Sequence, residues 1–177
     1  MAHHLYGIVP VRGPKPSVSA WTRALQRTIA DIHRRGRVAI VEGSSFGLAS
    51  AAARIARSRA DGLVLGVDWR PSVELTQKVR ARVEQAWSAG LVEETDAALA
   101  AGLGDCWVMR RSVVYPDVVA HLRGKQSHEA AQQRIVAGVL AAARVQHRQF
   151  QGVSGVRWLP SASLPAAGAA APELALA

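Results

Sequence analysis

Leu63-Val64-Leu65-Gly66-Val67-Asp68-Trp69-Arg70-Pro71 is the stretch of this sequence that decides the fold. Its first half is an apolar run without polar alternation, typical of a strand covered on both faces, and its second half is a turn into a long helix. Val38–Val41 gives the same strand signal, and Val156–Leu159 is expected to be a short closing strand. Strands that alternate with helices predict a parallel sheet, so we expect an α/β fold with a partial sheet flanked by helices and a helix-rich C-terminal half.

Apolar residues at helical spacing predict the long helices. The helix between Ser17 and Gly36 is expected to present one apolar face, formed by Trp21, Leu25, Ile29 and Ile32. A helix rich in small residues follows, from Leu48 to Ile55. The helix after Pro71 ends at Gly90 and buries a stripe of Leu75, Val79, Val83 and Ala86 or Trp87. The last long helix opens at Ser127 and buries Ile135, Val136 and Val139.

Length and composition indicate one globular domain. The chain has 177 residues, of which 49% are apolar and 20% charged, which excludes a disulfide miniprotein, a multidomain protein and a largely disordered chain. We expect the domain to cover residues 1–160 and the Ala- and Pro-rich residues 161–177 to form a disordered tail. The single Cys106 excludes an internal disulfide and a cysteine zinc site, and it is expected to be a buried small residue. No signal peptide or apolar span is visible, so a cytoplasmic protein without a membrane partner is expected.

The charge balance points to an anionic partner. Lys and Arg number 22 against 13 Asp and Glu, a net charge of +9, and 19 of the bases are Arg. A coding sequence rich in G and C would favour Arg and Ala regardless of function, so charge alone leaves both explanations open.

Two segments could bind phosphate. Glu42-Gly43-Ser44-Ser45 joins a predicted strand to a helix N-terminus, where unpaired N–H groups attract anions, but a plain serine-capped turn explains the same residues. Lys78 and Arg82 are four residues apart on one helix face, which could clamp a diphosphate or simply be solvated. His3-His4 has no partner at metal-ligand spacing, so no metal site is expected there. The phosphate loop G-x-x-x-x-G-K-[ST] is absent, as is G-x-G-x-x-G.

Taken in order, several segments resemble the dimethylallyltransferase (isopentenyltransferase) family, which prenylates the exocyclic nitrogen of adenine in tRNA or in free adenosine phosphates. The segments are His3-His4-Leu5, Ala30–Arg37, Val41–Ser45, Lys78–Val83, Ala89–Glu94, Val114–Asp117 and Leu122–Gly124. The resemblance covers about residues 2 to 160, and it implies a P-loop-NTPase-like sheet of which this chain holds part. The family's P-loop and the aspartate that serves as base would lie before Met1.

The resemblance also implies roles for individual residues. Ser45 and Arg82 match the catalytic donors that the family aims at the bond between the prenyl group and diphosphate, and we expect them to meet at one anion site. The implied diphosphate-binding residues are Gly43, Ser44, Ser45, Lys78 and Arg82. Residues 139–146 keep Ala143, Arg144 and Gln146 of a family signature, so Arg144 and Gln146, with Tyr115, are expected to line the substrate site.

The implied substrates are dimethylallyl diphosphate and an adenine nucleotide. Only Phe46 to Ser72 joins the turn to the basic helix, without the insertion that grips the anticodon stem in the tRNA enzymes. We therefore expect tRNA not to be a partner and its binding to be weak and salt-sensitive. No tightly bound cofactor is expected, apart from Mg²⁺ arriving with the diphosphate.

Three functions remain open at this point. The chain is expected to be an incomplete transferase that works with a P-loop-bearing partner or as a homo-oligomer, because Val38–Val41 and Leu63–Val67 are the two convincing strands, and two are too few for a free-standing parallel sheet. The alternatives are an enzyme of altered chemistry that uses a prenyl diphosphate or a nucleotide, and a non-catalytic phosphate-binding or regulatory protein.

Overall fold

The structure, a computed structural model, describes residues 2–42, 46–59, 62–68 and 72–160. The chain opens with α1 (Val18–Arg34) and α2 (Phe46–Arg57), followed by β1 (Leu65–Asp68). Next come α3 (Val73–Ala86), a π-helical turn η1 (Trp87–Leu91) and α4 (Val92–Ala100). The remaining elements are α5 (Trp107–Arg111), α6 (Tyr115–Leu122), α7 (His128–Gln151) and β2 (Arg157–Pro160). The predicted α/β class and helix-rich C-terminal half are confirmed.

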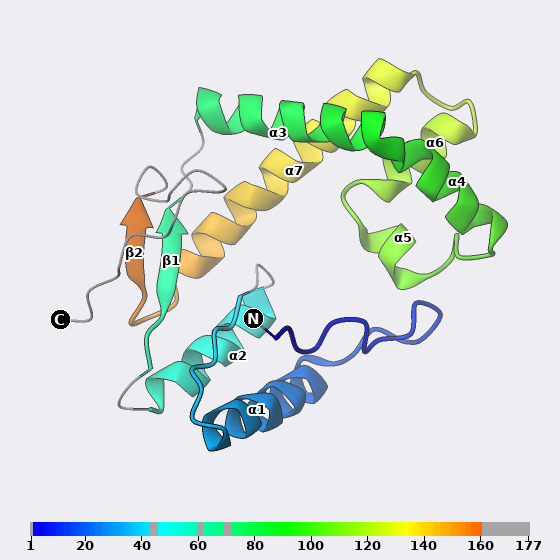
Figure 1. The fold of residues 1–177 in the computed structure, drawn as a ribbon. Helices are drawn as coiled ribbons and strands as arrows, with labels where there is room; N and C mark the ends of the chain where they lie inside the picture. The colour runs from blue at the N-terminus through cyan, green and yellow to red at the C-terminus, as the bar shows by residue number, and fades with distance from the viewer. Residues whose placement is uncertain (1, 43–45, 60–61, 69–71, 161–177) are drawn as a thin grey trace.

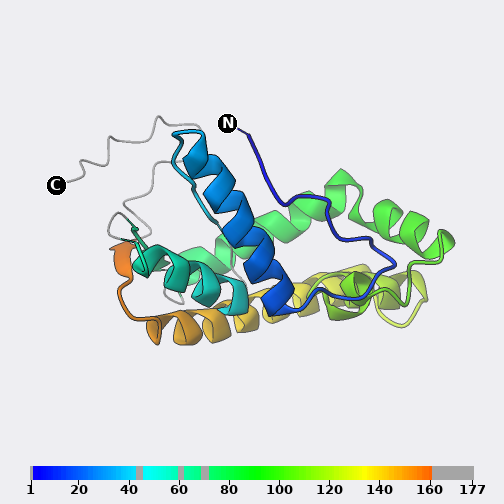
Figure 2. The ribbon, with the colours of Figure 1, turned by 90° about the horizontal axis from the view of Figure 1, so that it is seen from below.

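β1 and β2 form a two-stranded parallel sheet, with Leu65 opposite Arg157 and Val67 opposite Leu159. The strands predicted at residues 63–67 and 156–159 are thus confirmed within two residues. Figure 1 shows the sheet at one end of α7, with α3 and α7 side by side and α4 to α6 at the opposite end. Seen from below, α1 and α2 lie together on one side of α3 and α7 (Figure 2).

The strand predicted at Val38–Val41 is wrong. Residues 37–42 carry no strand assignment, and Val38 and Ile40 are 86% and 76% exposed where burial on both sides was expected. A strand needs a hydrogen-bonded neighbour, and in the described part of the chain β1 pairs with β2 and not with this segment. An apolar sequence therefore leaves a segment without regular secondary structure, with its β-branched side chains in solvent.

Capping groups set the helix boundaries where the sequence predicts them. Ser17, Ser72 and Ser127 each accept a hydrogen bond from a backbone N–H in the first turn of the helix that follows. Gly36, with φ +66°, ends α1 in a Schellman motif, in which Arg37 N–H donates to Ile32 O at 3.2 Å and Gly36 N–H to His33 O at 2.9 Å. Gly90, with φ +100°, breaks the helical path between α3 and α4 as predicted.

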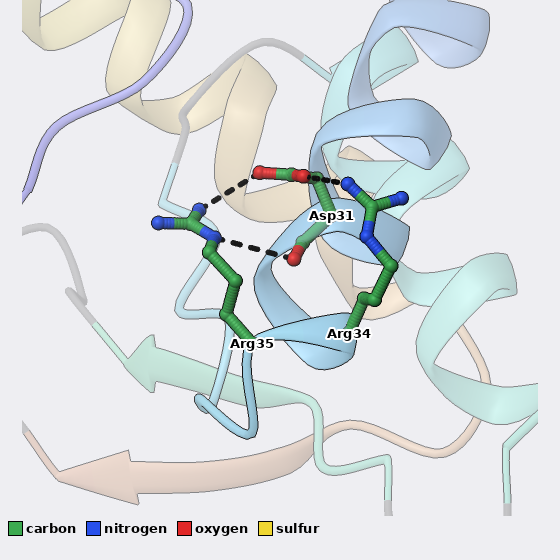
Figure 3. A network of polar contacts seen from close by, with 3 residues as sticks. All are labelled: Asp31, Arg34 and Arg35. Atoms are coloured by element: carbon green, nitrogen blue, oxygen red, sulfur yellow. Dashed lines mark hydrogen bonds and ion pairs between the residues drawn. The ribbon is translucent and has the colours of Figure 1, made fainter.

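A carboxylate reinforces the end of α1. Asp31 forms ion pairs with both Arg34 and Arg35, and Arg35 Nη2 lies 2.9 Å from Asp31 Oδ2 (Figure 3). Arg35 Nε also donates to the backbone oxygen of Asp31 at 3.3 Å. All three side chains are substantially exposed, so these contacts stabilise the helix end by little and leave it positively charged.

The core lies where α3, α6 and α7 meet. Val83, Val118 and Ile135, one from each helix, form the buried cluster, and Val118 and Ile135 are fully buried. Val79, Trp87, Val136 and Val139 pack around it, which confirms the stripes predicted on α3 and α7 and selects Trp87 over the exposed Ala86. The short helices α4, α5 and α6 lie outside the predicted elements.

Two polar contacts fix α6 between its neighbours. Tyr115 Oη donates to Glu94 Oε1 of α4 at 2.7 Å, and Arg134 Nε of α7 donates to Asp117 Oδ1 at 2.7 Å. The hydrogen bond to Glu94, with burial and the negative charge of Glu94 adding to it, raises the pKa of Tyr115 above its ordinary value.

Ile135→Ala is expected to lower the free energy of unfolding by about 2–5 kcal/mol, because it leaves a cavity at the point where three helices meet. Val145→Ala on the same helix is the control, since Val145 is 42% exposed, and it should change stability by less than about 0.5 kcal/mol. Urea unfolding followed by circular dichroism measures both. Equal losses would contradict this location for the core.

Tyr115 should ionise above its ordinary pKa in the folded chain. Tyr6 and Tyr115 are the two tyrosines, so in the Tyr6→Phe variant the tyrosinate absorbance reports Tyr115 alone. Because the folded pKa is raised, the contact stabilises the fold below the ordinary pKa, and this stability is lost as pH rises through the folded value. Adding Glu94→Gln should lower the absorbance midpoint, and an unchanged midpoint would refute the contact.

Candidate functional site

The predicted anion-binding turn precedes α2. Gly43, Ser44 and Ser45 lie outside the described residues, so the expected meeting of Ser45 with Arg82 stays a prediction. Glu42, directly before the turn, is exposed, and its Oε1 accepts a hydrogen bond from Tyr6 Oη at 3.2 Å. The N-terminal segment therefore reaches the residue next to the candidate phosphate turn.

Lys78 lies on α3, the helix that follows β1. Its Nζ is 2.6 Å from Glu74 Oε1, one turn earlier on the same helix. The hydrogen bond from Lys78 and its positive charge lower the pKa of Glu74. A diphosphate that binds Lys78 must therefore displace Glu74 or share the Lys78 ammonium group with it. The positive charge of Lys78 is thus partly neutralised by Glu74, which the sequence alone does not show.

Arg82 lies one turn after Lys78 and next to the buried Val83. Its side chain is exposed and has no hydrogen-bond or ion-pair partner within the described part of the chain. Because Val83 faces α6 and α7 in the core, its neighbour Arg82 points off the packed face. Of the two predicted cations on α3, Arg82 is the one whose donors no described side chain occupies.

The three residues expected to line the substrate site come from two helices, α6 and α7. Tyr115 begins α6, and its hydroxyl is occupied by Glu94. Arg144 is exposed and Gln146 half-buried, both in the C-terminal half of α7. The segment just before α6 contacts α7 at Gly138, where a Cβ would lie 2.8 Å from Val113 Cγ1, and Arg144 lies six residues further along α7, a rise of about 9 Å. Within the described residues no hydrogen bond or ion pair joins Tyr115 to Arg144 or Gln146, so their shared role at a substrate site stays a prediction.

A cavity of about 440 Å³ opens between α4, α5 and α6. Its lining includes Leu99, Asp105, Met109, Arg110, Val119 and Arg123. None of the site residues selected from the sequence lines it. The sequence signal that could have found it is the pair Arg110-Arg111 followed by Arg123, which draws attention only once the short helices α5 and α6 are known.

The described residues hold no cluster of three His, Cys, Asp or Glu side chains that could bind a metal ion. Among the helices that the structure describes, none is long and apolar enough to cross a membrane.

Comparison with known proteins identifies relatives. Residues 45–152 match the IPP transferase family (IPPT). The tRNA dimethylallyltransferase of Thermobifida fusca is 34% identical over 90 residues, which are 51% of this chain and 28% of that protein. The tRNA dimethylallyltransferase of Nocardia farcinica is 32% identical over 123 residues, 70% of this chain and 39% of that protein. The chain thus spans well under half the length of these curated relatives.

A solved structure shares the fold. The chain superposes on the tRNA delta(2)-isopentenylpyrophosphate transferase of Staphylococcus epidermidis with a TM-score of 0.75 at 16% identity, covering 89% of this chain and 74% of that one. The P-loop-NTPase-like character of the sheet stays a prediction, because the two described strands are too few to test it.

These relatives overturn one expectation from the sequence. They are named for action on tRNA, so the expectation that tRNA is not a partner is wrong. It rested on the short connection between residues 46 and 72, and the length of one connecting segment does not determine which surface of a basic chain meets RNA. The matched residues make up more than half of the sequence and include α3, α6 and all of α7, and on this evidence the chain belongs to the IPP transferase family.

Proposed function

We propose that this chain forms part of a dimethylallyltransferase that transfers the prenyl group of dimethylallyl diphosphate to an adenine amine in tRNA. The observation that carries the proposal is the exposed Arg82, without a described partner, inside the family match and on the helix that follows β1. A guanidinium held on a packed helix is a strong donor to diphosphate oxygens.

The reaction makes and breaks one bond at the same carbon. The amine nitrogen of adenine attacks the C1 carbon of the dimethylallyl group while the bond from C1 to the diphosphate oxygen breaks, and the electron pair of that bond leaves with the diphosphate. Negative charge grows on the leaving oxygen, so donors aimed at it lower the barrier. In our proposal Arg82 and Ser45 are these donors, Gly43 and Ser44 contribute backbone N–H groups, and Lys78 binds an outer phosphate oxygen.

The amine must also lose a proton to a base. We assign no residue of this chain to that role and propose that the base, together with a phosphate loop, is supplied by a segment outside residues 1–177. The support is that the sequence contains no G-x-x-x-x-G-K-[ST] motif, while the known relatives are much longer than the match. Dimethylallyl diphosphate is proposed to enter as its Mg²⁺ complex.

The acceptor follows from the relatives and from charge. The curated relatives act on tRNA by name, and the net charge of +9 favours a polyanion over a small nucleotide. Tyr115, Arg144 and Gln146 stay candidates for contacts with the acceptor.

Residues 1–177 given dimethylallyl diphosphate, Mg²⁺ and a tRNA anticodon hairpin should show no prenyl transfer, because loss of a positioned base alone costs about 10²- to 10⁴-fold. Adding the part of the Nocardia farcinica relative that this chain does not match, supplied in trans, should restore transfer. Chromatography of the digested RNA detects the prenylated adenosine, and a parallel reaction with AMP tests the free nucleotide as acceptor.

In the complemented reaction, Arg82→Gln should lower the rate by about 10²-fold or more, as for loss of one donor to a developing anion. Arg80→Gln is the matched control, because Arg80 is an equally charged, exposed residue on the same helix and should retain the rate within about twofold. Turnover by the lone chain would refute the need for a partner. If neither the lone chain nor the complemented chain produced prenylated adenosine, the non-catalytic alternative would be favoured.

A further inference from the structure

The cavity between α4, α5 and α6 has a charged rim and an apolar floor. Arg110 and Arg123 are exposed on its rim, and neither side chain has a hydrogen-bond or ion-pair partner in the described part of the chain. The floor is formed by Met109, which is 6% exposed, with the half-buried Leu99 and Val119. Its volume of about 440 Å³ falls in the range of small-molecule sites.

The backbone positions of the two arginines are fixed. Arg123 is the C-cap of α6. Its backbone N–H donates to Val119 O at 3.1 Å, and a Schellman motif at Gly124 follows it. Arg110 lies on α5, where its N–H donates to Cys106 O at 3.1 Å and the neighbouring Met109 is buried. Packed helices thus fix the backbone from which both arginine side chains extend at the cavity.

A third arginine contributes from the N-terminal segment. Arg12 donates to the backbone oxygens of Ala101 and Gly102, at the end of α4. Gly102 itself lines the cavity, and a Cβ placed there would lie 3.7 Å from Arg12 Nη1. Arg12 therefore offsets the negative end of the α4 dipole at the edge of the cavity. The residues that line the cavity carry two positive charges, Arg110 and Arg123, and one negative charge, Asp105, and Arg12 lies beside Gly102 at its edge.

Asp105 restricts the ligand to molecules that carry a hydrogen-bond donor as well as a phosphate. It too has no partner within the described residues, and a carboxylate can only accept hydrogen bonds. A ligand that suits all three parts has a phosphate for the arginines, a hydroxyl or amine donor for Asp105, and a ring for the apolar floor. A ribonucleotide has these three groups, whereas inorganic phosphate has only the first.

We propose that this cavity is a ribonucleotide-binding site in which Arg110 and Arg123 bind the phosphate and Asp105 accepts a hydrogen bond from the sugar or base. The site shares no residue with those assigned to the transfer reaction: a strand as ligand would make it a further contact of the tRNA acceptor and would rest on the proposed function, whereas a free nucleotide would be a separate ligand. The phosphate comes either from a free nucleotide or from a phosphodiester strand, and one experiment separates the two sources.

Met109 gives a direct readout, because Met1 and Met109 are the two methionines and Met109 lies in the cavity floor. With the methionine methyl groups ¹³C-labelled, uridine monophosphate should shift the Met109 resonance of the full chain in a saturable way. Uridine is used because it offers no adenine amine. Tetrauridylate binding more tightly than the monophosphate would identify a strand as the source, and the reverse order would identify a free nucleotide. Inorganic phosphate should bind at least about tenfold more weakly than uridine monophosphate.

The double variant Arg110→Gln, Arg123→Gln should raise the dissociation constant for uridine monophosphate about tenfold or more, since each substitution removes a charge-assisted contact to the phosphate. Arg23→Gln with Arg27→Gln, two exposed arginines of α1, is the matched control that removes the same net charge and should change the constant by less than about twofold. Asp105→Asn should weaken the uridine ligands but not inorganic phosphate. The proposal would be overturned if neither uridine ligand shifted the Met109 resonance. It would also be overturned if the two double variants lost the same affinity for uridine monophosphate.

Discussion

The packing of α3 against α7, closed by α6, is the contact on which the rest of this structure depends. Val83 comes from α3, which is distant in sequence from the consecutive helices α6 and α7 that carry Val118 and Ile135, and the three side chains bury one another where the helices meet. β1 immediately precedes α3 and β2 follows α7, so this contact brings the two strands side by side although 88 residues separate Asp68 from Arg157. The parallel sheet is a consequence of the helix packing, because strands of four residues hold little stability of their own.

Much of this architecture could be predicted from the sequence, because the long helices carry clear periodicity and clear caps. Ser127 opens α7, Gly36 ends α1, and the apolar stripes on α3 and α7 select the residues that are buried. The failure at Val38–Val41 has the opposite cause. Apolar β-branched residues favour a buried strand. A strand also needs a second strand to pair with, and the local sequence does not show whether one is present. The short helices α4 to α6 escaped prediction because fewer than ten residues each give too few turns for a periodic signal.

The candidate site divides in the same way. Residue type and spacing single out Lys78 and Arg82 as cations on one helix face, and the structure distinguishes them by what they touch, since Lys78 is paired with Glu74 while Arg82 is not paired within the described chain. Tyr115 and Arg144 are grouped by resemblance alone, and they lie on different helices, α6 and α7. Arg110 and Arg123 carry no motif, so only their meeting at one cavity makes them notable.

The distribution of positive charge links these surfaces. A basic chain could have concentrated its arginines in one phosphate cradle, yet here they lie on α1, on α3, along α7 and around the α4–α6 cavity. A small diphosphate can contact only one of these groups at a time, because α7 alone, at 24 residues, is about 36 Å long. A polynucleotide can contact several together, with each contact releasing counterions. Dispersed arginines on a rigid three-helix core therefore favour an extended anionic partner, which agrees with the proposed tRNA acceptor and leaves the diphosphate to the few donors near Arg82.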